Sequence, residues 1–546
     1  MEGGCWVRDC SGAPFFALPF LRGKKERNGK PDRCSEREPH HSAFESPSFS
    51  VYSPDMRSLL FFFLFIASLR APAQIFDFND NCRQAYNSIL ALKLQEGNAL
   101  LKAEEKKNPD NLIPLYLQNY VDFLSVYVTD THEEYDKRKK NKEVLLVLLA
   151  AGDYGSPYFL FTQAEVNLQW AAIEIKFGEY LNAIFEIRKA FKLLEENQKK
   201  FPEFKPNKKS LGVLYALLGS VPDKYKWGLN LLGMEGSVEK GIGYLKDLVD
   251  VGKKNDFIYQ EETITYYAFL LFHLQNQSDG AWKMLMENGF PKKDNLMTVY
   301  TCAHIGVYGK HNEEALKLLN NKPTDKAFVS FPFLNYLTGL AKLNKLDAGA
   351  DSYFKQFIAA YKGENHIKSS FQKIAWSYLL KDDTVNYFYF INKADNLGAS
   401  MVDADKQAKK EAESNRLPNK NLLRARLLFD GGYYQQAASE MSKLREGLFS
   451  NVEEQTEYLY RFGRIYDEWD RKDSALILYN SAIARGKDLP RYFAANSAFE
   501  SGKIYEAKGD KEKAKYYYNL CMSFENHEYK NGLDQKAKAG ISRLVK

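Results

Sequence analysis

Histidines and serine or glycine motifs are the first places to look for chemistry in this sequence. The chain has eight histidines, and none belongs to H-E-x-x-H, the spacing that places two zinc ligands and a general base on one helix. His304 and His311 lie seven residues apart, but a turn at Gly309 separates them, so we interpret both as ordinary helix histidines. Nucleophile-elbow, Walker and dinucleotide-binding motifs are also missing. The sequence therefore predicts no catalytic and no cofactor-binding residue, and we expect no enzyme activity.

A group of cysteines and histidines near the start could suggest a metal site. Cys5, Cys10 and Cys34 precede His40 and His41. Zinc-binding cysteine pairs are usually separated by about two to four residues, and histidine pairs by about three to five. Cys5 and Cys10 are separated by four residues, but His40 and His41 are adjacent, so the group does not fit the combined pattern and we predict no zinc site here.

A run of acidic residues at 403–413 could suggest calcium. Calcium loops place carboxylates around a tight turn with a glycine at the bend, and this run contains no glycine. Lysines recur between the acids at helical spacing, which favours pairs such as Asp405–Lys409 on a solvated helix. We therefore predict no metal, and a polar helix or linker over residues 399–420.

The most regular spacing in the chain belongs to small and aromatic residues near the C-terminus. A first copy of the pattern comprises Gly463, Tyr466, Ala475, Tyr479 and Ala482. A second copy comprises Gly502, Tyr505, Ala514 and Tyr518. Two antiparallel helices approach closely only where a small residue lies at their crossing, and an aromatic ring fills the space beside it. This is the tetratricopeptide pattern, so we assign these residues a packing role and predict three tetratricopeptide repeats over residues 421–546.

Residues 74–398 show the same pattern in a weaker form. Small and aromatic residues recur around short turns over 158–194, 295–321, 333–361 and 366–397. Alternating strand patterns bounded by hairpin turns are scarce. We therefore predict a diverged helical-repeat domain here and an all-α fold for the chain. The expected architecture is an α-α superhelix, a tetratricopeptide-like solenoid that is diverged in the N-terminal half and regular in the C-terminal part.

An apolar, glycine-rich insert at 211–245 departs from the repeat pattern. Its first part, 211–232, is more hydrophobic than a repeat helix. One interpretation is a buried helical hairpin at the centre of the fold. The alternative is an apolar surface that contacts a lipid or the face of a membrane.

The insert also carries residues that resemble a known family. These residues are Pro222, Gly233, Gly236, Gly241 and Leu245. They look like the Pro-containing apolar helix, the glycine turn and the following helix of the tetratricopeptide-repeat-protein-thirty-nine and inclusion-body-clearance superfamily. The resemblance implies a helical-repeat protein, here an exported relative of bacterial type.

Two helices further along are similar to the same family. The run Tyr336-Leu337-Thr338-Gly339 resembles one family helix, and the helix of Trp376 resembles the tryptophan-rich pair that follows it. The sequence departs from the family where Met234 replaces the usual aromatic residue and where no arginine follows Gly339. The resemblance spans Tyr158 to Val545.

The stretch after Met56 has the three parts of a secretory signal peptide. A short basic start is followed by the apolar run 59–69 and by the small-residue site Ala71-Pro72-Ala73. This apolar run is too short to cross a hydrocarbon layer about 30 Å thick. We therefore predict a signal peptide at 56–73. Because such a peptide works at an N-terminus, residues 1–55 are expected to be untranslated or disordered.

The cysteines after the predicted cleavage site do not form a disulfide framework. Cys82, Cys302 and Cys521 are an odd and widely scattered set, whereas exported folds held by disulfides have more cysteines, in pairs. We expect buried thiols, with a partner for Cys82 left open. The predicted location is the periplasm or cell envelope of a Gram-negative bacterium.

The charge distribution bears on the class of partner. The net charge of +6 comes from 76 basic and 70 acidic residues, which are mixed along the chain, whereas nucleic-acid-binding proteins concentrate lysine and arginine on one face. We predict no nucleic-acid partner and no cofactor.

The expected function is a non-enzymatic exported scaffold that binds a protein or peptide partner on its concave surface. The alternative is binding of a lipid or other apolar ligand, or peripheral membrane attachment, through residues 211–245.

Overall fold

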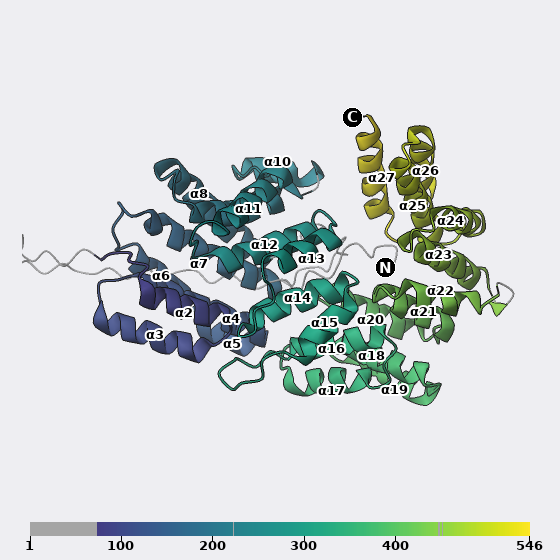
Figure 1. Cartoon of the computed structure of the whole chain (residues 1–546), viewed down its shortest axis with the longest axis horizontal. Coiled ribbons are helices and arrows are strands. Elements are labelled where there is room, and N and C mark those ends of the chain that lie inside the picture. Colours follow the sequence, from purple (N-terminus) through teal and green to yellow (C-terminus); the bar gives the residue numbers. More distant parts are fainter. Residues whose placement is uncertain (1–73, 222, 446–447, 450, 546) are drawn as a thin grey trace, which may run out of the picture.

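The computed structural model describes residues 74–221, 223–445, 448–449 and 451–545. These residues form successive pairs of antiparallel α-helices that wind into a curved array (Figure 1). The predicted all-α, tetratricopeptide-like superhelix is confirmed. The predicted signal peptide at 56–73 and the segment 1–55 lie outside the described residues.

The N-terminal part of the array packs mainly as the pairs α2/α3, α7/α8, α9/α11 and α12/α13. Its helices are α2 (Asp80–Leu90), α3 (Leu94–Lys107), α4 (Ile113–Thr129), α5 (His132–Lys139), α6 (Asn141–Leu149), α7 (Pro157–Lys176), α8 (Tyr180–Lys200), α9 (Pro206–Gly219), α10 (Asp223–Leu231), α11 (Val238–Gly252), α12 (Gln260–His273) and α13 (Ser278–Glu287).

The array continues as pairs from α14/α15 to α25/α26, with α20 packed against both α18 and α19. The middle helices are α14 (Leu296–Tyr308), α15 (Asn312–Asn320), α16 (Phe333–Asn344), α17 (Ala350–Ala360), α18 (Ile367–Leu380), α19 (Thr384–Asn396) and α20 (Asp403–Ser414). The last are α21 (Lys420–Asp430), α22 (Tyr434–Ser442), α23 (Val452–Glu468), α24 (Lys472–Gly486), α25 (Phe493–Ala507), α26 (Lys511–Ser523) and α27 (Lys530–Val545).

Caps and glycine turns set where the helices begin and end. Asn79 before α2 and Asn451 before α23 each accept a backbone N–H of the first turn through the side chain, which satisfies a donor that the helix itself leaves unpaired. The turns within three helix pairs contain Gly178, Gly432 and Gly509, all with φ near +80°. Glycine adopts this left-handed conformation without strain, so it allows the tight reversal between paired helices.

The two helices of a pair differ in burial. In α14 every residue from Leu296 to Val307 is buried, whereas its partner α15 buries only Asn312, Ala315 and Leu319. The same contrast separates α18 from α19 and α25 from α26. In these pairs the first helix therefore forms the inner layer of the array, and the second covers it with one face.

Two large hydrophobic clusters account for most of the core of the described chain, and a small third cluster joins α7 to α8 through Ala171, Ile175 and Ala183. The larger cluster extends from Cys82 to Leu427, and the second from Leu422 to Ala537. Figure 1 shows the helices of the second cluster, α21 to α27, at the right, where α25 to α27 rise away from the rest. The C-terminal repeats thus have their own core, and the remaining helices share another.

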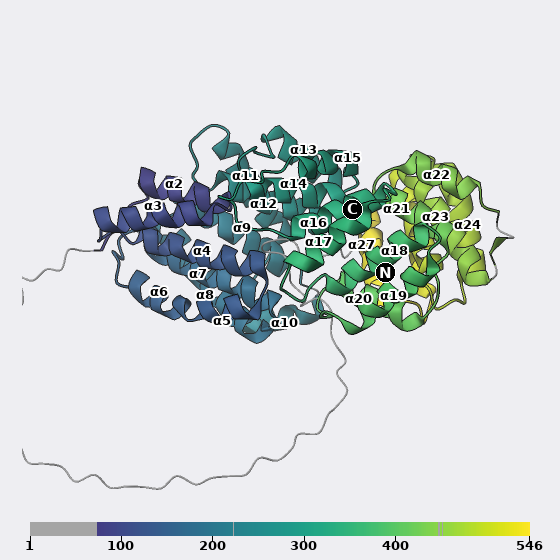
Figure 2. The same ribbon diagram turned by 90° about the horizontal axis from the view of Figure 1, so that it is seen from below.

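The N-terminal part of the array curls back onto its middle. The N–H of Leu296 donates to the carbonyl of Ala91 at 3.3 Å, and the N–H of Val329 donates to that of Leu92 at 2.8 Å. These contacts join the end of α2 to the start of α14 and to the segment before α16. In Figure 2, α2 to α4 accordingly lie beside the helices that follow α11. The first pairs and the middle pairs therefore form one closed body.

The apolar insert divides into buried and exposed helices. Helix α9 buries most of its residues, and Leu245 on α11 is fully buried, as a central hairpin requires. Helix α10 is different, because Trp227 is 70% exposed and Leu231 is 79% exposed. In the described part of the chain, no helix is both long and apolar enough to cross a bilayer.

Candidate functional site

A pocket lies where the first helix pairs meet the middle of the array. Its walls come from the ends of α4 and α7, from α14, and from the starts of α16 and α18. Six aromatic rings line it: Tyr127, Tyr180, Tyr300, Phe331, Phe333 and Tyr361. Its volume is about 70 Å³, roughly half that of a cavity of about 150 Å³ that takes up benzene, so it can accept the end of one aliphatic side chain. We call this site the junction pocket.

Asp130 forms the polar floor of the junction pocket. It ends α4 in a left-handed conformation, with φ of 56°, and its carboxylate accepts hydrogen bonds from the Tyr361 hydroxyl and, at 3.2 Å, from the Asn365 amide. Lys176 Nζ lies 3.3 Å from Asp130 Oδ1 and above the ring of Tyr127. Burial, together with Asp130, raises the pKa of Tyr361 well above its ordinary value, so the hydroxyl stays protonated and donates.

Asn365 gives the junction pocket a polar edge. Its Nδ2 group is used by Asp130, but its buried Oδ1 atom accepts no hydrogen bond from any residue that the structure describes. A buried acceptor without a donor costs free energy, which a ligand N–H would recover. Apolar walls with one or two placed polar atoms are the usual composition of a binding pocket.

A buried charge cluster joins the inner helices of the first pairs. Lys209 Nζ on α9 lies 2.7 Å from Glu165 Oε2 on α7 and 2.9 Å from Glu262 Oε2 on α12. The hydroxyls of Tyr86 and Tyr120 donate to Glu262 at 2.8 and 3.2 Å. This Lys209 cluster therefore links α2, α4, α7, α9 and α12 through one lysine.

Electrostatics explain why the Lys209 side chain stays charged. Burial alone would lower the pKa of Lys209, but Glu165 and Glu262 outweigh it and raise that pKa. Burial raises the pKa of Glu165, and the charge of Glu262 adds to the rise. Because Lys209 is fully buried and pairs with carboxylates of two other inner helices, we assign the cluster a role in holding the core together.

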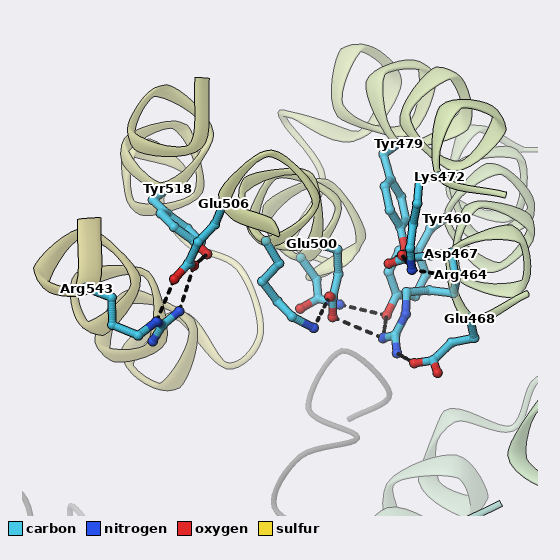
Figure 3. A network of polar contacts seen from close by, with 12 residues as sticks. Tyr460, Arg464, Asp467, Glu468, Lys472, Tyr479, Glu500, Glu506, Tyr518 and Arg543 are labelled. Carbon is cyan, nitrogen blue, oxygen red and sulfur yellow. Dashed lines mark hydrogen bonds and ion pairs between the residues drawn. The ribbon is translucent and has the colours of Figure 1, made fainter. Parts of the chain in front are cut away.

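A second charge network lies on the inner helices of the C-terminal repeats (Figure 3). The Arg464 guanidinium on α23 lies 3.4 Å from Glu500 on α25 and 3.4 Å from Glu468. Lys503 Nζ is 2.7 Å from Glu500, and Lys310 Nζ is 3.1 Å from Glu468. Since Lys310 comes from the turn between α14 and α15, this Arg464 network also ties the C-terminal repeats to the closed body.

Carboxylates at either side of the Arg464 network anchor the outer helices. Asp467 accepts hydrogen bonds from Lys472 at 2.9 Å and from the Tyr479 hydroxyl at 3.1 Å, which fixes α24 on α23. Glu506 accepts two from Arg543, at 2.7 and 2.8 Å, which fixes α27 on α25. In Figure 3 the Asp467 group lies beside Arg464 at the right, and the Glu506 group lies at the left, beyond Glu500. Each carboxylate joins neighbouring helices, and neither lines the junction pocket.

The glycines of the repeat pattern lie at helix crossings. A Cβ atom on Gly463 would lie 2.7 Å from the ring of Tyr479, and one on Gly502 would lie 2.7 Å from the ring of Tyr518. Both distances are shorter than any real carbon contact, so the aromatic residue of the second helix occupies the space that a side chain would need. These residues pack α23 on α24 and α25 on α26.

The other residues of the pattern also lie between paired helices. Ala475, Ala482 and Ala514 are fully buried on α24 and α26. Tyr466 stacks on Phe462 and Tyr505 stacks on Tyr517. None of these side chains lines the junction pocket.

The residues of the family-like motif lie where α9 meets α11. A Cβ atom on Gly236 would lie 2.1 Å from the backbone nitrogen of Gly219, and one on Gly241 would lie 2.3 Å from the carbonyl oxygen of Gly212. Gly233 has φ of +66° at the turn after α10. These positions serve close backbone approach. Pro222 lies outside the described residues.

The acidic segment differs from its prediction. Asp405 does not pair with Lys409 on a solvated face: it is fully buried and accepts the N–H groups of His366 and Ser369 at 2.6 and 2.8 Å. Lys409 pairs instead with Glu413. The prediction was wrong because the first turn of α18 leaves donors unpaired, and a carboxylate from α20 satisfies them.

The residues first considered for metal binding lie apart. His304 is buried among aromatic rings, whereas His311 stacks on Trp282 at 4.9 Å and contacts Asp279. Within the described ranges, no three His, Cys, Asp or Glu side chains gather as metal ligands would. The group from Cys5 to His41 lies outside those ranges.

The cysteines match their expected role. Cys82, Cys302 and Cys521 are buried free thiols. Burial raises the pKa of Cys82 and of Cys521 to about 12, so neither is a ready nucleophile.

Sequence reasoning missed the junction pocket and the Lys209 cluster. The pocket joins residues as far apart as Asp130 and Tyr361, which lie 231 positions apart, and nothing local connects them. Lys209 offered a clue, because it begins an otherwise apolar helical stretch at 209–218. A lysine in such a stretch needs buried carboxylates nearby.

Comparison with known proteins gives a limited result. The chain matches no protein-family model and no curated protein. It is similar to a solved structure of the human IFIT1 dimer with m7Gppp-AAAA, with 13% identity, a TM-score of 0.27, and coverage of 87% of this chain and 97% of that one. It is also similar to the P58(IPK) TPR domain, with 12% identity, a TM-score of 0.20, and coverage of 79% and 97%. At these scores neither likeness supports an inference, and the fold assignment rests on the helices described above.

Proposed function

We propose that this chain is a non-enzymatic helical-repeat scaffold that binds a protein or peptide partner through the junction pocket. The observation that carries the proposal is the pocket itself: six aromatic rings around a space of about 70 Å³, with the Asn365 Oδ1 acceptor at its edge. The end of a leucine or methionine side chain matches this space. A backbone N–H beside that side chain would donate to Asn365.

The polar floor favours an uncharged anchor. Asp130 already accepts from Tyr361 and Asn365 and pairs with Lys176, so its charge is neutralised within the protein. A partner lysine would have to displace Lys176, and a partner carboxylate would face Asp130. We therefore propose an apolar anchor residue within an extended segment, which is a common way for helical repeats to bind peptides.

The proposal also covers where the protein is located and to which superfamily it belongs. Export through the peptide at 56–73, to the periplasm or cell envelope of a Gram-negative bacterium, is supported by the three-part pattern of that segment. Membership of the tetratricopeptide-repeat-protein-thirty-nine and inclusion-body-clearance superfamily is supported by the glycine positions around Gly236 and Gly241. Sequencing the N-terminus of the exported protein tests the first point, since a peptide that covers Cys5 or Cys34 would contradict it.

Site-specific photo-crosslinking tests the binding proposal. Met401 lines the pocket and is 43% exposed, so a photoreactive residue there should reach a bound segment. The matched control is Val385 on the outer helix α19, which is 79% exposed and does not line the pocket. We expect one recurrent crosslinked peptide from position 401 in envelope extract, and none from position 385.

A synthetic copy of the crosslinked peptide then measures the role of the pocket. Asn365→Leu should weaken its binding about tenfold, because the variant removes one buried hydrogen bond. Replacing the anchor residue of the peptide by alanine should weaken it further. Equal crosslinking from positions 401 and 385, or unchanged affinity in Asn365→Leu, would overturn the proposal.

A further inference from the structure

Two neighbouring helices expose large apolar side chains that the core does not use. On α8, Leu181 is 74% exposed and Phe185 is 64% exposed; on α10, Trp227 is 70% exposed and Leu231 is 79% exposed. The opposite side of α8 already packs into the core through Ala183, Ala190, Phe191 and Leu194. The exposed residues therefore form a second apolar surface on the same helix.

Helical spacing gathers these residues with basic ones. Leu181, Phe185, Arg188 and Lys192 follow one another at intervals of three or four, so they share one face of α8. Trp227 and Leu231 are four apart and share a face of α10. We call these six residues the α8/α10 face.

Direct contacts join the two helices. Arg188 Nε donates to the carbonyl of Leu232 at 2.9 Å, and the Lys192 ammonium lies against Gly233. The basic part of α8 thus meets the end of α10. Figures 1 and 2 show α8 and α10 along the same margin of the molecule, at the top of its left part in the first view and at its lower edge in the second.

The exposed part of this face carries only positive charge. Between 181 and 192 the exposed residues of α8 are Leu181, Asn182, Phe185, Arg188, Lys189 and Lys192, and none is acidic. The one acidic residue in that stretch, Glu186, is less exposed and pairs with Lys142 at 2.5 Å. From 225 to 231, α10 has no acidic residue at all. The face therefore combines aromatic and aliphatic side chains with Arg188 and Lys192, and Glu195 and Glu196 lie about one turn beyond it on α8.

We propose that the α8/α10 face docks the protein onto the surface of an anionic lipid bilayer. Tryptophan, phenylalanine and leucine insert at the boundary between headgroups and acyl chains, and lysine and arginine beside them are attracted to anionic headgroups. The protein lies on the bilayer and does not span it, in agreement with the lack of a long apolar helix among the described residues.

Charge argues against a second copy of the chain as the occupant. In a two-fold symmetric dimer this face would meet itself, and Arg188, Lys189 and Lys192 would then lie opposite like charges, with acidic residues only at the edge of the face. An anionic bilayer supplies the missing negative charge over the whole face. The bilayer is thus the occupant that satisfies both its apolar and its charged parts.

Vesicle co-sedimentation of the purified protein tests the proposal. Vesicles of phosphatidylcholine alone are compared with vesicles that also contain phosphatidylglycerol, with all variants sharing one N-terminus. We expect binding to require the anionic lipid and to weaken as salt screens the charges. Arg188→Gln with Lys192→Gln should weaken binding about 25-fold, at about fivefold for each charge near the surface.

The apolar part of the face needs its own variant and control. Phe185→Ser with Trp227→Ser should weaken binding more than tenfold, because two aromatic rings no longer enter the bilayer. The control, Val385→Ser with Ile477→Ser, removes side chains that are 79% and 68% exposed on other helices and should bind as the parent does. All four positions are exposed, so the circular-dichroism melting curves should coincide.

Depth quenching locates the contact. Brominated lipid should quench the fluorescence of Trp227, and Trp227→Phe should remove that quenching while most binding remains. Equal binding to neutral and anionic vesicles, or equal binding by the Phe185→Ser/Trp227→Ser variant, would overturn the proposal. So would a concentration-dependent dimer, seen by analytical ultracentrifugation, that these same two substitutions abolish.

Discussion

The Lys209 cluster and the Arg464 network use the same arrangement in two different settings. Each places a buried cation between carboxylates on inner helices. Around Lys209 every charged side chain is at most 6% exposed. Around Arg464 the centre is equally buried, but Lys503 is 48% exposed and Glu468 is 35% exposed. The Lys209 cluster is sealed and depends on its single cation. In the open Arg464 network, other cations and solvent can compensate when one cation is lost.

We expect the largest loss of stability when Lys209 is replaced. Lys209→Met leaves Glu165 and Glu262 buried without a cation, which should lower the free energy of unfolding by about 3–5 kcal/mol. Urea unfolding followed by circular dichroism measures the change. Adding Glu165→Gln and Glu262→Gln to the same chain should restore part of the lost stability, because no charge then remains unpaired. A Lys209→Met variant as stable as the parent would show that the cluster is not sealed.

Arg464→Met should cost less, although Arg464 is also buried. Lys503 and Lys310 stay within reach of Glu500 and Glu468, so we expect a loss of about 2 kcal/mol. Fluorescence of Trp469, which lies just after α23, reports unfolding of the C-terminal repeats. A loss as large as that in Lys209→Met would remove the distinction between the two settings.

Tight packing at a helix crossing should contribute less to the free energy of unfolding than either charge network. Gly463→Ala places a methyl group 2.7 Å from the Tyr479 ring, and we expect a loss of about 1–2 kcal/mol. The control is Gly228→Ala on α10, where an added Cβ meets nothing within 4 Å. That substitution should be neutral or slightly stabilising, because alanine favours a helix. Thermal melts of the two variants compare them directly.

The two regions should also differ in how their stability depends on pH. Burial raises the pKa of Glu174, on α7 of the closed body, to about 7. The unfolded chain loses this proton first, so the contribution of Glu174 to stability falls as the pH rises from about 4.5 to 7. The stability of Glu174→Gln relative to the parent should therefore increase over that window in urea titrations. A constant difference between pH 5 and 8 would contradict the assignment.

Glu468 should behave in the opposite way. Burial would raise its pKa, but Lys310 and Arg464 outweigh burial and lower the pKa to about 2. Its contribution to stability is present above about pH 4.5 and is lost as the pH falls towards 2. Glu468→Gln should thus be less stable than the parent at pH 7 and equal to it near pH 2, again by Trp469 fluorescence.

The regular part of the fold could be predicted because its signals are local. Gly463 and Tyr479 lie 16 positions apart on one helix pair, and their types follow from the close approach of two helices. Gly236 and Gly241 were singled out only by the family resemblance, and the structure places both at tight backbone contacts. Cys302 and Cys521 were likewise expected to be buried from composition alone.

The candidate site could not be predicted, because it depends on how the array curls. Asp130 meets Tyr361 only after the intervening helices have all been placed. Polarity was misleading at Asp405, where a charged residue caps a helix from another part of the chain. The exposure of Trp227 could not be predicted either, since apolar residues of the insert occur both in α9, which is buried, and in α10, which is not.

The contact between Asp130 and the segment around Tyr361 also changes how the chain should fold. In an open solenoid each repeat touches only its neighbours, so stability adds up along a line and the ends can fray or be trimmed. Here the first pairs and the middle pairs meet, and closing that loop of 231 residues costs entropy before any contact is gained. The closed body should therefore fold late and cooperatively, because its stability depends on the contact that closes it. The C-terminal repeats can fold independently of that step.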